Sequence, residues 1–241
     1  MGKQDKIFEE GNVSGLPFSF NQEVTEVFED MIDRSVPGYN TTLRIIQQQT
    51  KNHYIDGSNI YDLGCSLGAS TSSLLNALNG RSKVIAIDNS ESMVRACTER
   101  FSKYIKTGQA NFLKEDISYS EILNASVVVI NFVLQFLSIE ERAELMQKIY
   151  QGLVPGGILI LSEKVHFDSK KRTKEISNIH HSFKAANGYS KLEISSKRDS
   201  LEGVLVTETE SQHLDRAKEI GFKVSTKLMS NLNFLTYKFQ K

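Results

Sequence analysis

Apolar and polar residues alternate along the chain in blocks that predict strands and helices in turn. Strand-like apolar blocks occur at 59–63, 83–88, 109–113, 127–130 and 158–161, and helix-like spacing occurs at 70–79, 90–106 and 138–152. The block 127–130 is apolar throughout, as a strand covered on both faces should be. This alternation implies a mostly parallel sheet with helices on both faces, so the pattern predicts an α/β fold.

The N-terminal part of the chain predicts helices that precede the first strand. Apolar residues at helical spacing fill about 22–34, and a second helix is expected at about 41–50. Pro37 and Gly38 separate the two. We therefore expect a helical cap over a ligand pocket at about 17–50. It is preceded by a polar segment, 1–16, that we expect to be loose or draped over the surface.

The C-terminal part breaks the strand–helix rhythm once and then completes the sheet. Residues 165–200 are rich in Lys, His and Ser and predict a helical insertion. A helix at 213–220 is followed by strands at 222–228 and 233–239, which we expect to form a hairpin. The prediction is one domain over 1–241 with a seven-stranded, Rossmann-like sheet whose C-terminal part contains an antiparallel strand.

A glycine turn after the first strand indicates the ligand class. The turn contains Gly64 and Gly68 and is preceded by Asp62, and Asp88 ends the next strand about twenty residues later. A dinucleotide site needs a further glycine between these two and an entrance open to pyrophosphate. An acid at the entrance suits a sulfonium or ammonium group instead, so the pattern resembles the S-adenosylmethionine site of the class I methyltransferase fold. The later Leu-Val-Pro-Gly-Gly segment, 153–157, agrees with it.

Ligands of open parallel sheets lie beyond the carboxyl ends of the strands, and this places the candidate binding residues. Backbone groups of Gly64, Cys65 and Ser66 would contact the amino-acid part. Asp88 would accept hydrogen bonds from the ribose hydroxyls, and Asn89 follows it at the same strand end.

Two further strand ends complete this candidate set. The Asp116 carboxylate and the Ile117 amide would contact the adenine. Asn131 would bind the amino-acid ammonium. A turn or helix-cap role is the alternative for Asp116 and Asn131.

Composition restricts the other functions. Lys and Arg number 29 and Asp and Glu number 29, so the net charge of zero disfavours a large nucleic-acid surface. No apolar run has membrane-spanning length, and residues 1–20 lack a signal-peptide core. We expect a cytoplasmic protein without direct nucleic-acid or membrane binding.

No side chain with an evident role as a general base emerges from the sequence. Cys65 is expected to pack in its turn rather than react. The histidines His166, His180, His181 and His213 are scattered over the insertion and a late helix, so solvated faces are expected and no metal site is predicted.

Over nearly its whole length the chain resembles the bacterial carboxy-S-adenosylmethionine synthases. The segments that carry the likeness are Val36-Pro37-Gly38-Tyr39, the turn 62–69, Asp88-Asn89-Ser90 with Met93, and Lys197-Arg198. The resemblance implies S-adenosylmethionine and prephenate as substrates, and carboxy-S-adenosylmethionine and phenylpyruvate as products. It implies a homodimer, and a separate tRNA carboxymethyltransferase that uses the product at the wobble uridine.

The resemblance also adds two residues to the site. Tyr39 would hydrogen-bond the carboxylate end of the ligand. Arg198 would be the catalytic residue, reaching the neighbouring chain's pocket and holding a carboxylate through its fork of N–H donors. An ordinary S-adenosylmethionine-dependent methyltransferase and a non-catalytic S-adenosylmethionine-binding protein remain the alternatives.

Overall fold

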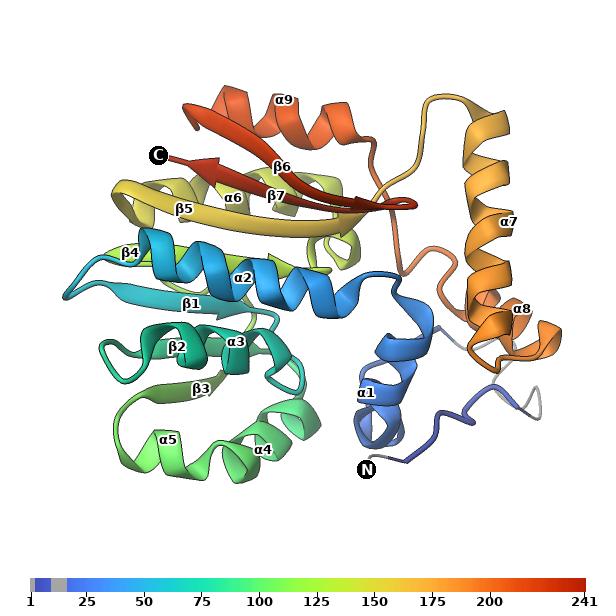
Figure 1. The fold of residues 1–241 in the computed structure, drawn as a ribbon, viewed down its shortest axis with the longest axis horizontal. Coiled ribbons are helices and arrows are strands. Elements are labelled where there is room, and N and C mark those ends of the chain that lie inside the picture. Colours follow the sequence, from blue (N-terminus) through green and yellow to red (C-terminus); the bar gives the residue numbers. More distant parts are fainter. Residues whose placement is uncertain (1–2, 10–16) are drawn as a thin grey trace.

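A seven-stranded sheet in the order β3-β2-β1-β4-β5-β7-β6 forms the centre of the molecule (Figure 1). The computed structural model describes residues 3–9 and 17–241. The strands are β1 (Asn59–Leu63), β2 (Val84–Asp88), β3 (Ala110–Lys114), β4 (Ala125–Asn131), β5 (Leu153–Lys164), β6 (Val224–Asn231) and β7 (Phe234–Gln240). Strands β1 to β5 pair in parallel, and β7 runs antiparallel to both of its neighbours. The predicted α/β sheet is confirmed.

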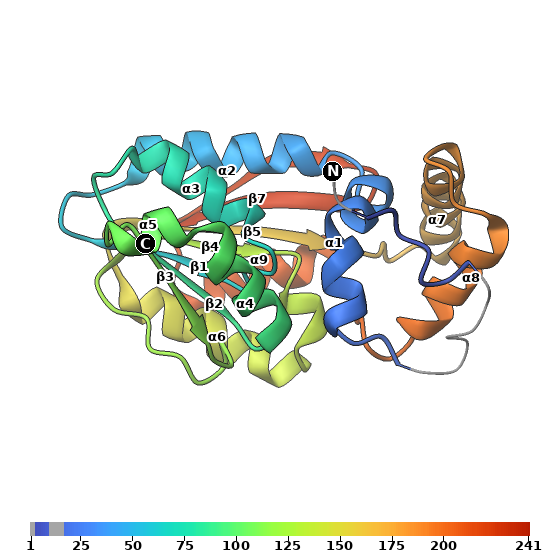
Figure 2. The ribbon, with the colours of Figure 1, turned by 90° about the horizontal axis from the view of Figure 1, so that it is seen from below.

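Helices cover both faces of this sheet and also lie beyond its strand ends. The helices of the described chain are α1 (Gln22–Ser35), α2 (Tyr39–His53), α3 (Ala69–Leu78), α4 (Glu91–Arg100), α5 (Ser102–Lys106), α6 (Ile139–Gly152), α7 (Lys170–Ala186), α8 (Lys191–Ser200) and α9 (Glu210–Ile220). Figure 2 shows α2 and α3 on one side of the strands and α6 on the other.

The apolar strand β4 shows why two layers of helices are needed. Its side chains alternate between faces: Val127 and Val129 belong to one buried cluster, and Val128 and Ile130 belong to the other. The first cluster contains side chains of α2, α3 and α4, whereas the second contains side chains of α6 and α9. All four β4 residues are fully buried, which is the arrangement that their unbroken apolar run predicts.

Local signals fix several helix starts. The predicted capping box at α6 is present, with Ser138 and Glu141 satisfying each other's backbone amides. Ser90 caps α4 by accepting from the Met93 amide. The helix predicted at 90–106 is divided at Phe101 into α4 and α5, and β5 is longer than the predicted 158–161.

Helices α1, α7 and α8 lie beyond the carboxyl ends of the strands, away from the faces that α2 and α6 cover (Figures 1 and 2). Helix α2 packs along the sheet against α3, and only its N-terminal end reaches the strand ends. The stretch predicted as a helical insertion contains α7 and α8.

The described part of the first segment is held more firmly than expected. Asp5 and Phe8 are 1% and 2% exposed, so the prediction of a loose or draped segment is wrong for these two residues. The Asp5 carboxylate accepts from the Tyr189 hydroxyl and thereby joins this segment to the loop between α7 and α8. Residues 1, 2 and 10–16 of that prediction lie outside the described residues.

Candidate active site

A cavity of about 420 Å³ opens at the carboxyl ends of the parallel strands. Five strand ends line it in the order in which the strands lie in the sheet: Asp116 after β3, Asp88 on β2, Gly64 after β1, Asn131 on β4 and Lys164 on β5. Because neighbouring strands are about 4.8 Å apart, these residues are spread along the sheet edge rather than clustered at one point. The cavity can therefore hold an elongated ligand or two ligands side by side.

The turn after β1 is held in a conformation that brings its backbone to the cavity. Gly64 has φ +73°, and a Cβ atom at this position would lie 2.5 Å from the Val133 side chain. Ser66 also has a positive φ, 49°, and its amide donates to the Asp88 carboxylate at 2.8 Å. Gly64, Cys65 and Ser66 all line the cavity, while the amides of Gly64 and Cys65 donate to the Ile87 carbonyl. Contacts of their backbone with a ligand stay a prediction.

Asp88 connects the turn to the next helix. One carboxylate oxygen accepts from the Ser66 amide, and the other accepts from the Ser90 amide at 2.9 Å. Burial raises the pKa of Asp88, while these two amides lower it. Since carboxylate oxygens have further lone pairs, two ribose hydroxyls can still be accepted.

The predicted adenine residues lie at the same end of the cavity. Asn89 and Asp116 are exposed at its opening, and Ile117 is buried in its wall. The Asp116 carboxylate accepts from the Ser118 amide, so the turn role that the sequence left open is present. This contact leaves the second carboxylate oxygen available, and an adenine contact stays a prediction.

A strained loop follows Asn131. The Asn131 amide group donates to Ser70 Oγ at 3.1 Å, and its buried Oδ1 has no partner in the described structure. Phe132 has φ +63°, which is rare for a bulky residue and marks strain at functional sites.

The buried carboxylate of Glu163 holds this loop in place. It accepts from the consecutive amides of Val133, Leu134 and Gln135 at 3.1, 2.8 and 3.2 Å. These amides lie at the start of the short 3-10 helix η1 (Leu134–Phe136).

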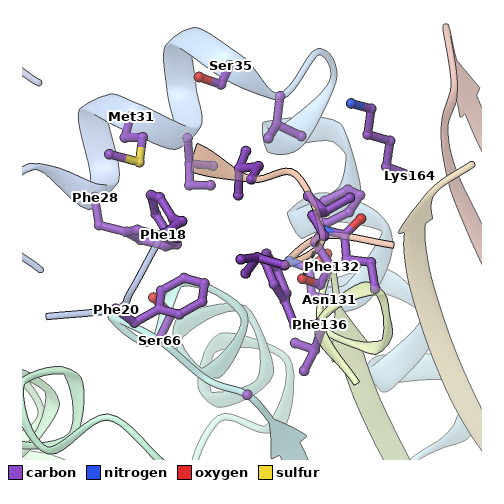
Figure 3. A pocket seen from close by; sticks show the side chains of 18 of the residues that line it. Phe18, Phe20, Phe28, Met31, Ser35, Ser66, Asn131, Phe132, Phe136 and Lys164 are labelled. Atoms are coloured by element: carbon purple, nitrogen blue, oxygen red, sulfur yellow. Dashed lines mark hydrogen bonds between the residues drawn. The ribbon is translucent and has the colours of Figure 1, made fainter. Parts of the chain in front are cut away.

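Aromatic side chains enclose the cavity. Figure 3 shows Phe18, Phe20 and Phe28 on one side, and Phe132 and Lys164 on the other. The Tyr39 ring lies 6.3 Å from the Phe132 ring, and burial raises the pKa of its hydroxyl, which therefore stays protonated. Tyr39 lines the cavity, and its hydrogen bond to the carboxylate end of the ligand stays a prediction.

Beyond Asn131 the cavity wall is basic. Lys164 from β5, Lys184 from α7 and Lys197 from α8 all line it, and we refer to this region as the lysine end. Lys184 and Lys197 are only 8% and 7% exposed. Burial lowers the pKa of Lys184 to about 7 and that of Lys197 to about 8, and it also lowers the pKa of Lys164.

These lysines differ in their partners. Lys197 Nζ donates to Ser35 Oγ at 3.2 Å and lies 4.0 Å from the Asp5 carboxylate. Within residues 3–9 and 17–241, Lys164 and Lys184 form no ion pair, and no protein carboxylate neutralises them.

Two histidines contradict the expectation of solvated faces. His180 and His213 are 4% and 1% exposed, so that prediction is wrong for both. His180 Nε2 donates to the Ser35 carbonyl at 2.7 Å, which anchors α7 to α1 beside the lysine end. Burial lowers the pKa of His180 to about 3, so the ring is neutral at physiological pH. Nowhere in the described chain do three or more metal-ligating side chains converge on a site.

Asp62, just before the glycine turn, and Cys65, within it, have packing and hydrogen-bonding roles inside the protein. Asp62 is 1% exposed, accepts from Thr71 Oγ1 at 2.5 Å and does not line the cavity. The expectation that it faces a cationic ligand is therefore wrong. The Cys65 thiol is buried and its pKa is raised, chiefly by its contact with Cys97, which agrees with a packing role.

Arg198 lies outside the cavity of its own chain. Its side chain is 62% exposed and pairs with Asp199 at 2.7 Å. It lines a separate shallow groove with residues of α7 such as Lys174 and His181. Nine of the ten predicted ligand residues therefore line one cavity, and Arg198 is the exception.

Comparison with known proteins decides the family. The model of a methyltransferase domain matches residues 60–157. The carboxy-S-adenosyl-L-methionine synthase of Shewanella halifaxensis is 43% identical over 231 residues, which cover 95% of each chain. That of Vibrio vulnificus is 47% identical over 206 residues, covering 85% of this chain and 84% of the relative. The chain belongs to the carboxy-S-adenosyl-L-methionine synthase family.

Solved structures at low identity show the fold. An O-methyltransferase family protein from Burkholderia thailandensis superposes with a TM-score of 0.64 at 14% identity, and the match covers 96% of this chain and 66% of that one. The plantazolicin methyltransferase BpumL gives 0.63 at 15% identity, with 89% of both chains covered. Human N-acetylserotonin methyltransferase gives 0.60 at 14% identity, and the chain spans only 55% of its length. The predicted class I methyltransferase fold is confirmed.

Sequence reasoning missed the lysine end. Lys164 follows an apolar strand, so the strand-end rule that selected Asn131 would have found it. Lys184 and Lys197 resemble ordinary surface lysines of polar helices, and nothing local distinguishes them. The aromatic wall was missed too, although Phe18 and Phe20 alternate just before α1.

Proposed function

We propose that this protein carboxylates the methyl carbon of S-adenosylmethionine with prephenate as the carboxyl donor. The observation that carries the proposal is the cavity, in which nine predicted ligand residues come together in a chain of this family. Turn and strand ends would hold the S-adenosylmethionine. Asp88 would accept hydrogen bonds from the ribose hydroxyls, and Asn131 would accept one from the ammonium group. Tyr39 would donate a hydrogen bond to the carboxylate of the amino-acid part.

The proposed chemistry needs no protein base. Prephenate loses its ring carboxylate as CO2 and its ring hydroxyl as hydroxide, and the electrons complete the aromatic ring of phenylpyruvate. The hydroxide removes a proton from the acidic sulfonium methyl group and becomes water. The resulting ylide carbon attacks CO2 and forms the new C–C bond. The protein contributes proximity and charge stabilisation, which agrees with the absence of an evident base in the sequence.

Arg198 is proposed to act on the cavity of a partner subunit. Because its guanidinium is exposed outside its own cavity, a role at the ligand requires a second copy of the chain. In a two-fold dimer each arginine would bind the transferred carboxylate in the partner's site. We also propose that the product passes to a tRNA carboxymethyltransferase and that the enzyme works in the cytoplasm without a metal. No helix in the described part of the chain is both long and apolar enough to cross a membrane.

Mass spectrometry tests the reaction. Incubation with S-adenosylmethionine and prephenate should give phenylpyruvate and an S-adenosylmethionine derivative heavier by one CO2 unit. S-adenosylhomocysteine as the product would indicate a methyltransferase instead, and no turnover would indicate a binding protein.

Mixing two inactive variants tests the arrangement in trans. Asp88→Ala damages a chain's own cavity, whereas Arg198→Ala damages only the residue lent to the partner. A mixed dimer regains one intact site, so a re-equilibrated mixture should recover roughly a quarter of wild-type activity. A mixture as inactive as its components would place Arg198 in its own chain's site and contradict the proposal.

A further inference from the structure

The lysine end contains Lys184, which is buried, and Lys164, which is partly buried, and neither has a counter-ion among the described residues. Lys184 is 8% exposed, and neither it nor Lys164 pairs with a carboxylate of the described residues. Buried charges are ordinarily paired, because an unpaired one costs several kcal/mol of solvation. An anionic ligand in the cavity would stabilise the charged form of both lysines, so they are suited to bind one.

The order of strand ends shows which part of the ligands reaches these lysines. Asp116, Asp88, Gly64 and Asn131 belong to β3, β2, β1 and β4, which the proposed function assigns to the adenosyl and amino-acid parts. Lys164 lies on β5, the next strand along, about 14 Å from the strand of Asp88 at 4.8 Å per strand. The lysine end is thus left for the second substrate.

Figure 3 agrees with this division. Lys164 lies on the far side of Asn131 and Phe132 from the Ser66 turn, below Ser35 of α1. His180 and Lys197 are tied to the backbone and side chain of Ser35, so α1, α7 and α8 form a fixed wall behind Lys184.

We propose that Lys164 and Lys184 bind the carboxylate that the donor retains, the 2-keto acid group of prephenate that remains in phenylpyruvate. This inference rests on the proposed function. It separates two carboxylates: the transferred one is held by the partner's Arg198, whereas the retained one is held by lysines of the cavity's own chain. Lys197 serves mainly to neutralise the buried Asp5, because it is the only one of the three lysines within ion-pair distance of a described carboxylate.

The separation of the two carboxylates predicts which ligands depend on the lysines. Phenylpyruvate keeps the carboxylate in question, so it should compete with prephenate. Carboxy-S-adenosylmethionine lacks it and carries the transferred group instead. Phenylacetone, in which a methyl group replaces this carboxylate, should bind far more weakly than phenylpyruvate to the wild type.

The experiment replaces each lysine by a neutral side chain of similar length. Lys164→Met and Lys184→Met should each raise the KM for prephenate and the inhibition constant of phenylpyruvate about ten- to a hundredfold. They should also remove most of the preference for phenylpyruvate over phenylacetone. Affinities for S-adenosylmethionine and carboxy-S-adenosylmethionine should stay within about twofold of wild type, which also shows that the variants fold. Lys171→Met, at an exposed position of α7 outside the cavity, is the matched control.

Two results would overturn the inference while leaving the proposed function intact. One is an unchanged KM for prephenate and unchanged phenylpyruvate inhibition in both variants. The other is a loss of S-adenosylmethionine affinity as large as the loss for prephenate, which would assign the lysines to the methionine carboxylate. Failure of the wild type to use prephenate would instead contradict the proposed function.

Discussion

The two ends of the cavity are built in different ways. At one end, the strand-turn end, Gly64, Ser66, Asp88 and Asp116 lie in or next to strands and are positioned by short turns. At the lysine end, Lys184 and Lys197 come from helices. Lys197 donates to Ser35, and the helix that carries Lys184 is anchored to Ser35, distant in sequence, through His180. A binding site can thus combine a locally encoded half with a half that exists only in the folded chain.

The largest effect is expected at the strand-turn end from Asp88→Ala. Two ribose hydrogen bonds to a charged acceptor would be lost, each worth about 1.5–3 kcal/mol. The Ser66 and Ser90 amides would also lose their acceptor. Calorimetry should show at least a hundredfold weaker S-adenosylmethionine binding. Near-wild-type affinity would remove Asp88 from the ligand site.

A smaller and more selective effect is expected from Arg198→Ala. Loss of a bidentate contact should weaken carboxy-S-adenosylmethionine binding about ten- to a hundredfold. Binding of S-adenosylmethionine, which lacks this carboxylate, should change little. Calorimetry with both ligands measures the difference, and Arg198→Lys should restore little because an ammonium lacks the fork. Equal losses for the two ligands would take Arg198 out of carboxylate recognition.

The backbone of the glycine turn offers a test of stability. Gly64→Ala should cost about 1–3 kcal/mol for the positive φ, and more for the contact with Val133. Gly57→Ala is a matched control, because Gly57 has φ +76° and open space around its Cβ position. Urea unfolding should show a larger loss for Gly64→Ala, partly restored by adding Val133→Ala. Equal losses would mean that the contact with Val133 is unimportant.

The lowered pKa of Lys184 at the lysine end should make the free energy of unfolding depend on pH. Burial lowers the pKa of Lys184 from 10.5 to about 7, so between these values the unfolded chain binds more protons. Stability due to Lys184 should therefore rise with pH across that window, by at most about 1.36 kcal/mol per pH unit.

Lys184→Met isolates this contribution. Lys164 on β5, Lys197 on α8 and His180 and His181 on α7 are its charged or titratable neighbours, and they remain in the variant. The gain in stability over wild type should be greatest near pH 7 and should shrink towards pH 10. A constant difference in stability between variant and wild type across this range would show that the pKa of Lys184 is not lowered in the folded protein.

The same comparison explains how far the sequence could be interpreted. Asp88 was found because its spacing from Gly64 depends only on one strand–turn–helix unit, and the seven strands were found because apolar blocks mark them. Lys184 and Lys197 lie in helices whose exposed and buried lysines look alike in sequence. Their helices are held by contacts with Ser35, which lies 145 positions from His180 of α7 and 162 positions from Lys197 of α8, and no local pattern encodes such contacts.

The role of Arg198 could not be tested in the structure of a single chain. The resemblance selected this residue, yet among the described side chains its exposed guanidinium forms hydrogen bonds and an ion pair only with Asp199. Its proposed role needs a partner subunit, which neither the pattern of one sequence nor the fold of one chain contains.

One measurement tests the central claim, that prephenate delivers its ring carboxylate to the methyl carbon of S-adenosylmethionine. Prephenate labelled with carbon-13 in the ring carboxyl group is incubated with the enzyme and S-adenosylmethionine in buffer containing unlabelled bicarbonate. We predict that the label appears in full in carboxy-S-adenosylmethionine and that phenylpyruvate forms in equal amount. An unlabelled carboxylated product, or S-adenosylhomocysteine in its place, would contradict the account.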